Sequence, residues 1–265
     1  MYLKSNWRVL TIGDGDLTFT LSLAKYHQLQ ALSASVLDSQ STLTSKYEIN
    51  GANELKQLGI DTYYELDITS NKTWPETLKH QFDLIIFQFP LVPSAKNKQE
   101  FKQRNNQNLV NRQLLRHYLS ACFEYFLDPL GQRLSYITSK EVKPYSHWQI
   151  ETDLTYKTNI NYIGKQEFKY LLFPEYQIRN VDRDKQVKDT KGFIYCYSDA
   201  TLHADLVSQF LPFTFLKPEY CPLCRVGPFQ SDLDKQNHLN SSKHKKLAHY
   251  QNEWFGYIDK SINVS

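Results

Sequence analysis

Residues 9–24, VLTIGDGDLTFTLSLA, constrain the fold of this chain more than any other stretch. The apolar run that ends at Ile12 predicts a buried strand, and apolar residues recurring every three or four positions after the turn predict an amphipathic helix. Between the two, Gly13 and Gly15 allow a tight turn in which the backbone approaches a ligand closely. A strand, a glycine turn and a helix in this order are typical of nucleotide-type cofactor sites in α/β proteins.

The turn fits two classes of cofactor. A dinucleotide fingerprint has the form G-x-G-x-x-G, and Thr18 stands at the place of its third glycine. S-adenosylmethionine has no pyrophosphate, so its site tolerates Asp14 and Asp16, which can pair with its amino group and sulfonium. The acidic turn favours S-adenosylmethionine, with Gly13, Asp14, Gly15 and Asp16 as candidate ligands. A glycine turn of some other α/β protein remains an open alternative.

Two further predicted strands end in side chains suited to the same cofactor. Residues 31–39 end near Asp38, 25 residues beyond Gly13, where nucleotide-binding α/β folds place an acid on the ribose hydroxyls. After the strand predicted at 60–67, we expect Asp67 to accept from the adenine amino group and Ile68 to cover the ring. A solvated aspartate at a strand end is the alternative for Asp38.

The clearest predicted strand is FDLIIFQFP, residues 82–90, and another, RLSYITS, leads directly to Lys140. Ligands of open parallel sheets bind at the carboxyl ends of the strands, so the residues there should border the reacting methyl group. Phe89 is suited to stack on a planar substrate, although it also fits a core position. The candidate catalytic residues are Gln88, Phe89, Pro90, Lys140 and Tyr145.

Composition is that of a globular chain with a full core. The 265 residues are 41% hydrophobic, and no apolar run approaches the ~20 residues that span a bilayer. We therefore expect a soluble protein of the cytoplasm, or of the nucleolus if the host is eukaryotic. Cys122 and Cys196 stand alone in apolar surroundings, and this cysteine usage favours a reducing compartment.

The net charge is only +3, so any nucleic-acid surface must be local. Residues 94–116 hold six Lys or Arg against one Glu, beside the predicted site. Such a segment can clamp phosphates, and a solvated charged surface is the alternative. The candidate RNA-binding residues in this segment are Lys96, Lys98, Lys102 and Arg104.

The second strong motif is Cys221-x2-Cys224-x13-His238-x5-His244. Two thiolates and two imidazoles at this spacing match a structural Cys2His2 zinc site, in which the four ligands close a tetrahedron. The stretch HLNSSKHKKLAHY resembles matrin-type fingers that bind double-stranded RNA, which implies phosphate contacts by Lys243, Lys245 and Lys246. A structural cap or a protein-binding finger is the alternative.

Four stretches together resemble one family, the 25S ribosomal RNA uridine-N3 methyltransferases. GDGDLTFTLSLA is similar to its G-x-G-D-F-S-F-S-x-x-L-A opening, and FDLIIFQFP to its F-D-x-I-I-F-N-F-P. SKEVKPYSHWQIE and LLFPEYQIRN resemble its K-x-x-x-P-Y-x-x-W and F-x-x-Y-P-G-Y-x-x-R segments. Gln88 stands where the family has Asn, and Leu91 where it has His. The resemblance covers roughly residues 7–197.

The resemblance implies a class I methyltransferase fold, an α/β architecture with a mostly parallel seven-stranded sheet and helices on both faces. It also implies methyl transfer from S-adenosylmethionine to N3 of a uridine in ribosomal RNA. We expect a methyltransferase domain over 1–200, a connector over 201–216 and a zinc finger with its tail over 217–265. The alternatives are a non-catalytic RNA-binding or ribosome-assembly protein that retains the fold, and a methyltransferase for another base or for tRNA.

Overall fold

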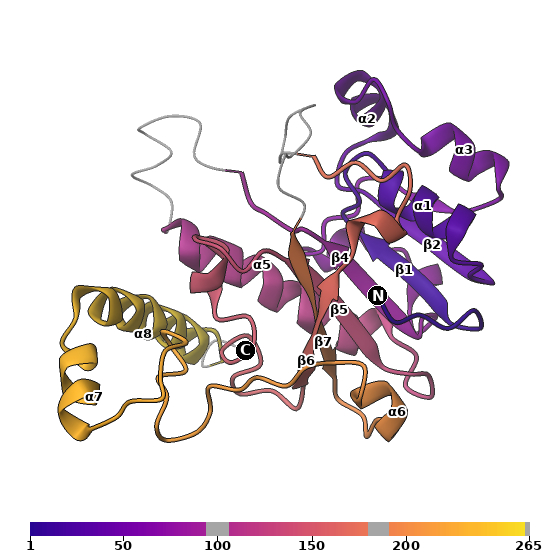
Figure 1. The fold of residues 1–265 in the computed structure, drawn as a ribbon. Helices are drawn as coiled ribbons and strands as arrows, with labels where there is room; N and C mark the ends of the chain where they lie inside the picture. The colour runs from indigo at the N-terminus through magenta and orange to yellow at the C-terminus, as the bar shows by residue number, and fades with distance from the viewer. Residues whose placement is uncertain (94–105, 180–190, 263–265) are drawn as a thin grey trace, which may run out of the picture.

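A seven-stranded sheet in the order β3-β2-β1-β4-β5-β7-β6 forms the centre of the computed structural model, which describes residues 1–93, 106–179 and 191–262 (Figure 1). The parallel strands are β1 (Arg8–Ile12), β2 (Ala31–Ser35), β3 (Thr62–Tyr63), β4 (Leu84–Gln88) and β5 (Leu134–Ser139). β7 (Gly192–Ser198) runs antiparallel between β5 and β6 (Asn161–Phe168). The predicted mostly parallel seven-stranded sheet is confirmed.

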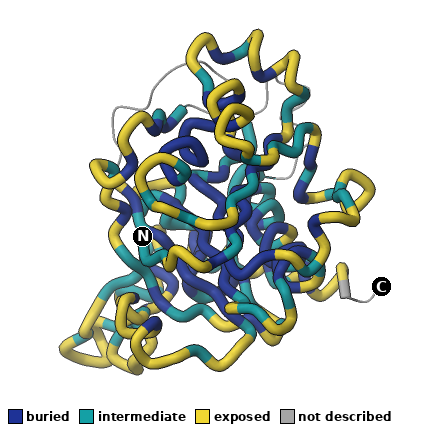
Figure 2. The backbone as a smooth tube through the Cα atoms, turned by 90° about the vertical axis from the view of Figure 1, so that its right-hand side faces the viewer, coloured by how far each residue is buried: buried dark blue, intermediate teal, exposed yellow. Residues whose placement is uncertain are grey.

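Helices cover both faces of this sheet because successive side chains of each strand point to opposite sides. On one face, Leu10 and Ile85 pack in a cluster with α5 (Gln107–Ala121). On the other, Val9 and Leu84 pack with Phe19 of α1 (Thr18–Tyr26). Both faces of β4 are therefore buried, which explains its unbroken apolar sequence, and Figure 2 shows the buried centre of the molecule.

The remaining helices are shorter, apart from the last one. They are α2 (Gln40–Lys46), α3 (Ala52–Gln57), α6 (Ala204–Val207), α7 (Asp232–Leu239) and α8 (Ser242–Ile262). A π-helical segment, Cys122–Phe126, continues α5, and 3₁₀ turns occur at Asn71–Thr73, Glu76–Leu78, Tyr145–Trp148 and Tyr170–Leu172. None of the described helices is long and apolar enough to cross a membrane.

Two strands are shorter than the sequence predicts. β2 ends at Ser35 and β3 holds only two residues, so Asp38 and Asp67 lie in the loops that follow. Glu65 adopts a left-handed conformation, with φ 58°, and bends the chain out of the strand. The two loops still run together, because Leu66 N donates to Val36 O at 3.0 Å and Glu65 N to Asp38 O at 3.2 Å.

The C-terminal helix α8 belongs to the main core as much as to the predicted finger. Trp254 and Ile258 of α8 are buried in the same cluster as Leu115 and Tyr118 of α5. Figure 1 shows α8, drawn in yellow, beside α5, with α7 at its outer end. The C-terminal segment is therefore anchored to the face of the sheet that α5 covers.

Candidate active site and metal centre

A cavity of about 730 Å³ opens at the carboxyl ends of β1, β2, β4 and β5. Each of these strands delivers a loop to its wall, and the loop after β3 contributes as well. The cavity brings together every residue that the sequence assigned to cofactor or catalysis: Gly13, Asp14, Gly15, Asp16, Asp38, Asp67, Ile68, Gln88, Phe89, Pro90, Lys140 and Tyr145. Their individual roles remain predictions.

The glycine turn is packed tightly against β4. Gly13 has φ 60°, and a Cβ on it would lie 2.8 Å from Cε2 of Phe87, so a side chain at this position would be strained and would clash. Asp14 N donates to Ser35 O at 3.0 Å, which ties the turn to the end of β2. The turn therefore presents backbone, with little side-chain bulk, to the cavity.

Asp14 binds the first turn of the helix that follows the glycine turn. Its Oδ2 accepts from Thr20 N at 2.7 Å and from Thr20 Oγ1 at 2.5 Å, inside α1. Only 5% of Asp14 is exposed, and burial, together with the neighbouring charge of Asp16, raises its pKa to about 7. At neutral pH the carboxyl is therefore poised between its two protonation states.

Asp14→Asn should remove a pH dependence of stability. The unfolded chain releases the Asp14 proton near 3.8 and the folded protein near 7, so the folded state binds more protons between these values. The free energy of unfolding should thus fall as pH rises from about 4 to about 7 and level off above pH 7. The total loss should be about 4 kcal/mol, since each unit of difference between the folded and unfolded pKa corresponds to about 1.36 kcal/mol. Asp14→Asn should lack this loss when urea unfolding is followed across that range. If the free energies of unfolding of the two proteins change with pH in the same way, Asp14 does not have a raised pKa in the folded protein.

Asp16 is held by a partner that sequence reasoning missed. Its Oδ2 accepts from Nε of Arg179 at 2.6 Å, and its Oδ1 accepts from Thr18 N at 3.0 Å. Arg179 lines the same cavity and lies 163 residues away in the chain. The signal was present in LLFPEYQIRN, which resembles a family segment ending in Arg, but no local pattern pairs it with Asp16. A positively charged group of the cofactor bound at Asp16 would share this carboxylate with the guanidinium of Arg179.

The two acids assigned to ribose and adenine are also engaged by protein groups. Asp38 Oδ2 lies 3.0 Å from Nζ of Lys46, an ion pair that sets the carboxylate at the rim of the cavity. Asp67 Oδ1 accepts from Thr69 N at 2.8 Å and from Thr69 Oγ1 at 2.7 Å. These bonds fix the direction of both carboxylates, and their proposed contacts with cofactor use the remaining lone pairs.

Gln88 carries the most telling feature of the cavity. It is 9% exposed, and neither Nε2 nor Oε1 of its amide meets hydrogen-bond geometry with any described residue. A polar neighbour is the buried hydroxyl of Tyr176, also at the cavity wall, whose pKa burial raises and the Gln88 amide lowers. Leaving a buried donor and acceptor unpaired costs about 1–3 kcal/mol each, so such an amide at a cavity wall is typical of a ligand contact. An amide presents one donor and one acceptor side by side, which matches the edge of a nucleobase.

The aromatic residues at the site are partly committed to packing. Phe89 has φ 49°, and its ring packs edge-on against Phe168 at 5.5 Å between ring centres. Tyr145 packs edge-on against Trp148 at 5.0 Å. Both rings still line the cavity, so each offers part of its surface to a planar substrate.

His117 is a cavity-lining residue without any sequence signal, since it lies within the regular helix α5. Burial lowers its pKa, with Asp67 opposing this effect and Arg116 adding to it. A neutral imidazole in the cavity is able to accept a proton at neutral pH.

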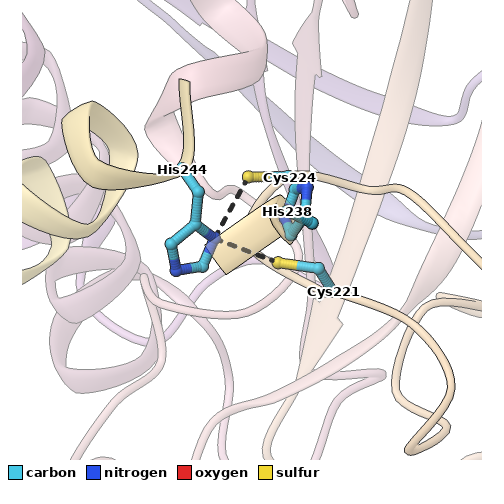
Figure 3. Close-up of side chains that lie close together, drawn as sticks. All are labelled: Cys221, Cys224, His238 and His244. Atoms are coloured by element: carbon cyan, nitrogen blue, oxygen red, sulfur yellow. Dashed lines mark hydrogen bonds between the residues drawn. The ribbon is translucent and has the colours of Figure 1, made fainter. Parts of the chain in front are cut away.

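The second site is the cluster of Cys221, Cys224, His238 and His244 (Figure 3). One ligand atom from each residue lies within 4.8 Å of the others, and Nδ1 of His244 faces both sulfurs at 3.5 Å. His238 Nε2 is buried and has no hydrogen-bond partner in the described part of the chain. An unpaired nitrogen beside two thiols fits a tetrahedral zinc ion, so the residues present are compatible with the predicted zinc finger.

The basic candidates lie in two places. Lys243, Lys245 and Lys246 are exposed on the first turns of α8, beside the metal cluster. Lys96, Lys98, Lys102 and Arg104 lie outside the described residues.

The family model for rRNA (uridine-N3-)-methyltransferase BMT5-like proteins matches residues 10–180. The chain belongs to this BMT5-like family. The match begins in β1 and includes the glycine turn, the strand ends and Arg179. Family membership together with the sheet topology supports an S-adenosylmethionine-dependent RNA methyltransferase.

Individual relatives are distant. Uncharacterized protein At4g26485 of Arabidopsis thaliana is 27% identical over 178 residues, which are 66% of this chain and 82% of the relative. Heavy metal-associated isoprenylated plant protein 41, also from Arabidopsis thaliana, is 26% identical over 190 residues, covering 68% of this chain and 34% of the relative. Among solved structures, TrmN from Thermus thermophilus has 13% identity and a TM-score of 0.43, covering 73% of this chain and 44% of that one.

Proposed function

We propose that this BMT5-like protein transfers a methyl group from S-adenosylmethionine to N3 of a uridine in ribosomal RNA. The observation that carries the proposal is the buried amide of Gln88 at the wall of the cavity that the glycine turn also lines, where none of its contacts with described residues meets hydrogen-bond geometry. Bound S-adenosylmethionine supplies an electrophilic methyl group. The family match and the carboxylates along the cavity support its binding there, through Gly13, Asp14, Gly15, Asp16, Asp38, Asp67 and Ile68.

N3 of uracil holds a usable lone pair only after it loses a proton, because it lies between two carbonyl groups. The protein must therefore stabilise an anion spread over O2, N3 and O4. Lys140 at the end of β5 places a cation at the cavity wall, where it stabilises charge on a carbonyl oxygen. His117, neutral because burial lowers its pKa, is the group we assign to accept the proton, directly or through water.

The other residues orient the base. The Gln88 amide holds its edge, while Phe89, Pro90 and Tyr145 enclose a uracil that has left its stack. Alignment of N3, methyl carbon and sulfur in a line supplies much of the rate.

We also propose that residues 1–200 form the methyltransferase domain, that residues 201–216 connect it to the finger, and that the finger of residues 217–265 docks structured RNA. This role fits the cytoplasm or the nucleolus.

Gln88→Ala should lower methyl transfer about 100-fold, the typical loss when one preorganised polar contact to a reacting group is removed. The affinity for S-adenosylmethionine should not change, since the proposed contact is to the base. Transfer of tritium to total RNA, followed by separation of nucleosides, measures the first quantity, and calorimetry measures the second. The matched control is Gln132→Ala, an exposed glutamine at the opposite end of β5, which should keep full transfer.

The identity of the labelled nucleoside tests the chemistry. Label in 3-methyluridine from large ribosomal RNA supports the proposal, and label in another nucleoside or in tRNA overturns the target while keeping the enzyme. Cofactor binding with no transfer to any RNA would favour the non-catalytic RNA-binding or assembly protein. Full activity of Gln88→Ala would show that Gln88 does not hold the base.

A further inference from the structure

Two segments far apart in the sequence form the surface between the cavity and the metal cluster. Tyr145 lines the cavity and begins the 3₁₀ turn Tyr145–Trp148. His147, in the same turn, has its ring centre 6.3 Å from that of Tyr250 in α8. Nζ of Lys246 lies 5.7 Å from the centre of the Tyr250 ring. A continuous line of side chains thus leads from the cavity wall to the basic turn of the finger.

This surface is electropositive. Lys143, Lys243 and Lys246 are exposed, and none of the three forms an ion pair with any residue of the described ranges 1–93, 106–179 and 191–262. Burial lowers the pKa of His147, and these three lysines and Arg225 lower it further. The charge of Arg225 is compensated, because it pairs with Glu151 at 2.5 Å and Glu141 at 3.3 Å. The three lysines are left uncompensated around one imidazole.

The two halves of this surface are held at a fixed separation. Gln149 Nε2, buried one residue after the 3₁₀ turn, donates to Leu223 O between the two cysteines at 2.9 Å. Nδ2 of Asn108 in α5 donates to His147 O at 2.9 Å, and the Arg225–Glu151 pair closes the other side. Because the finger is fastened to the segment that carries Tyr145, the surface needs no rearrangement to act as one site.

We propose that Lys143, His147, Lys243 and Lys246, here named the bridging patch, bind the phosphate backbone of a structured RNA and lead it from the finger to the cavity. Uncompensated lysines interleaved with His147 and Tyr250 suit phosphates and exposed bases, which an RNA substrate presents together. The finger half was predicted from the sequence, while Lys143 and His147 come from the methyltransferase half. The inference rests on the proposed function and assigns the path of its substrate.

The test compares one lysine from each half of the bridging patch. Binding of a fluorescein-labelled RNA stem-loop by anisotropy, over a series of salt concentrations, should show that Lys143→Ala and Lys246→Ala each weaken binding about fivefold. Each should also reduce the slope of log affinity against log salt by about 0.7–0.9, and the double variant should lose both contributions. Lys56→Ala on α3, an exposed lysine on the far side of the sheet, is the charge-matched control and should bind as the parent protein does.

Equal melting temperatures and metal contents will show that the variants are folded. If Lys246→Ala weakens RNA binding and Lys143→Ala does not, the bridging patch is overturned, because the finger then docks RNA without the methyltransferase half. Unchanged salt slopes for both variants would overturn it as well. Methyl transfer is measured in parallel on the parent protein. If the variants reduce the salt slope but the parent transfers no methyl group, the proposed enzyme activity is refuted and the bridging patch stands. If the parent transfers methyl groups but the salt slopes of the variants are unchanged, only the bridging patch is refuted.

Discussion

Cys224→Ser, or removal of metal with a strong chelator, should unfold the finger and bring methyl transfer close to zero. Among the described residues, the apolar cluster of the predicted finger has four buried members, which are too few to fold a module without metal: Cys221, Leu223, Cys224 and Leu247. Structural zinc typically contributes about 10–16 kcal/mol of binding free energy that appears as folding free energy. The metal should therefore decide whether this segment is ordered.

Unfolding of the finger should also affect the cavity, because the finger contacts the segment after β5 that carries Tyr145. Leu223 O accepts from Gln149, and Arg225 neutralises Glu151, which is almost fully buried. Without the finger, Glu151 would be left as a buried acid paired only at 3.7 Å with Lys165, and the turn carrying Tyr145 would lose its support. We expect one zinc per chain by elemental analysis, and a lower melting temperature together with lower tritium transfer after its removal.

Cys122→Ser is the matched control, since Cys122 is a buried free thiol in α5's π-helical extension, away from the metal cluster. It should retain one equivalent of zinc. A Cys224→Ser protein that keeps its metal, its melting temperature and its transfer activity would contradict both the zinc site and its coupling to the cavity.

Asp153→Ala should destabilise the whole protein by about 3–5 kcal/mol, the usual loss when one partner of a buried ion pair is removed. Asp153 Oδ2 accepts from Nη2 of Arg112 at 2.5 Å, and the Arg112 side chain is fully buried. The guanidinium also lies 5.0 Å from the ring centre of Trp254, whose Nε1 donates to Asp153 O at 2.9 Å. Deleting the carboxylate leaves a charge without its partner where α5 meets α8.

Urea unfolding measures this loss, and two variants make it specific. Asp259→Ala removes an exposed pair with Lys157 and should leave the unfolding midpoint unchanged. Combining Asp153→Ala with Arg112→Met should recover part of the stability, because the unpaired charge is then absent. A loss for Asp153→Ala no larger than that for Asp259→Ala would show that α8 does not depend on this pair.

Much of the cavity was predictable because its parts are local in sequence. The glycine turn, the Gln88-Phe89-Pro90 strand end and Lys140 each stand where an apolar run stops, and the parallel order of the strands brings such ends to one edge. The metal cluster was predictable for the same reason, since its four ligands follow a spacing that one short module imposes. These features depend on backbone periodicity and turn chemistry, which the sequence carries directly.

Other features depend on contacts that no local pattern encodes. Arg179 meets Asp16 across 163 residues, and His117 faces the cavity only because of how α5 packs on the sheet. No pattern in the C-terminal segment indicates that Trp254 of α8 enters the core beside α5. The sequence by itself therefore determined the type of sheet, the loops that line the cavity and which Cys and His residues come together in the C-terminal segment. The tertiary structure decided which charges compensate one another and where the finger lies, because both follow from the packing of surfaces that are distant along the chain.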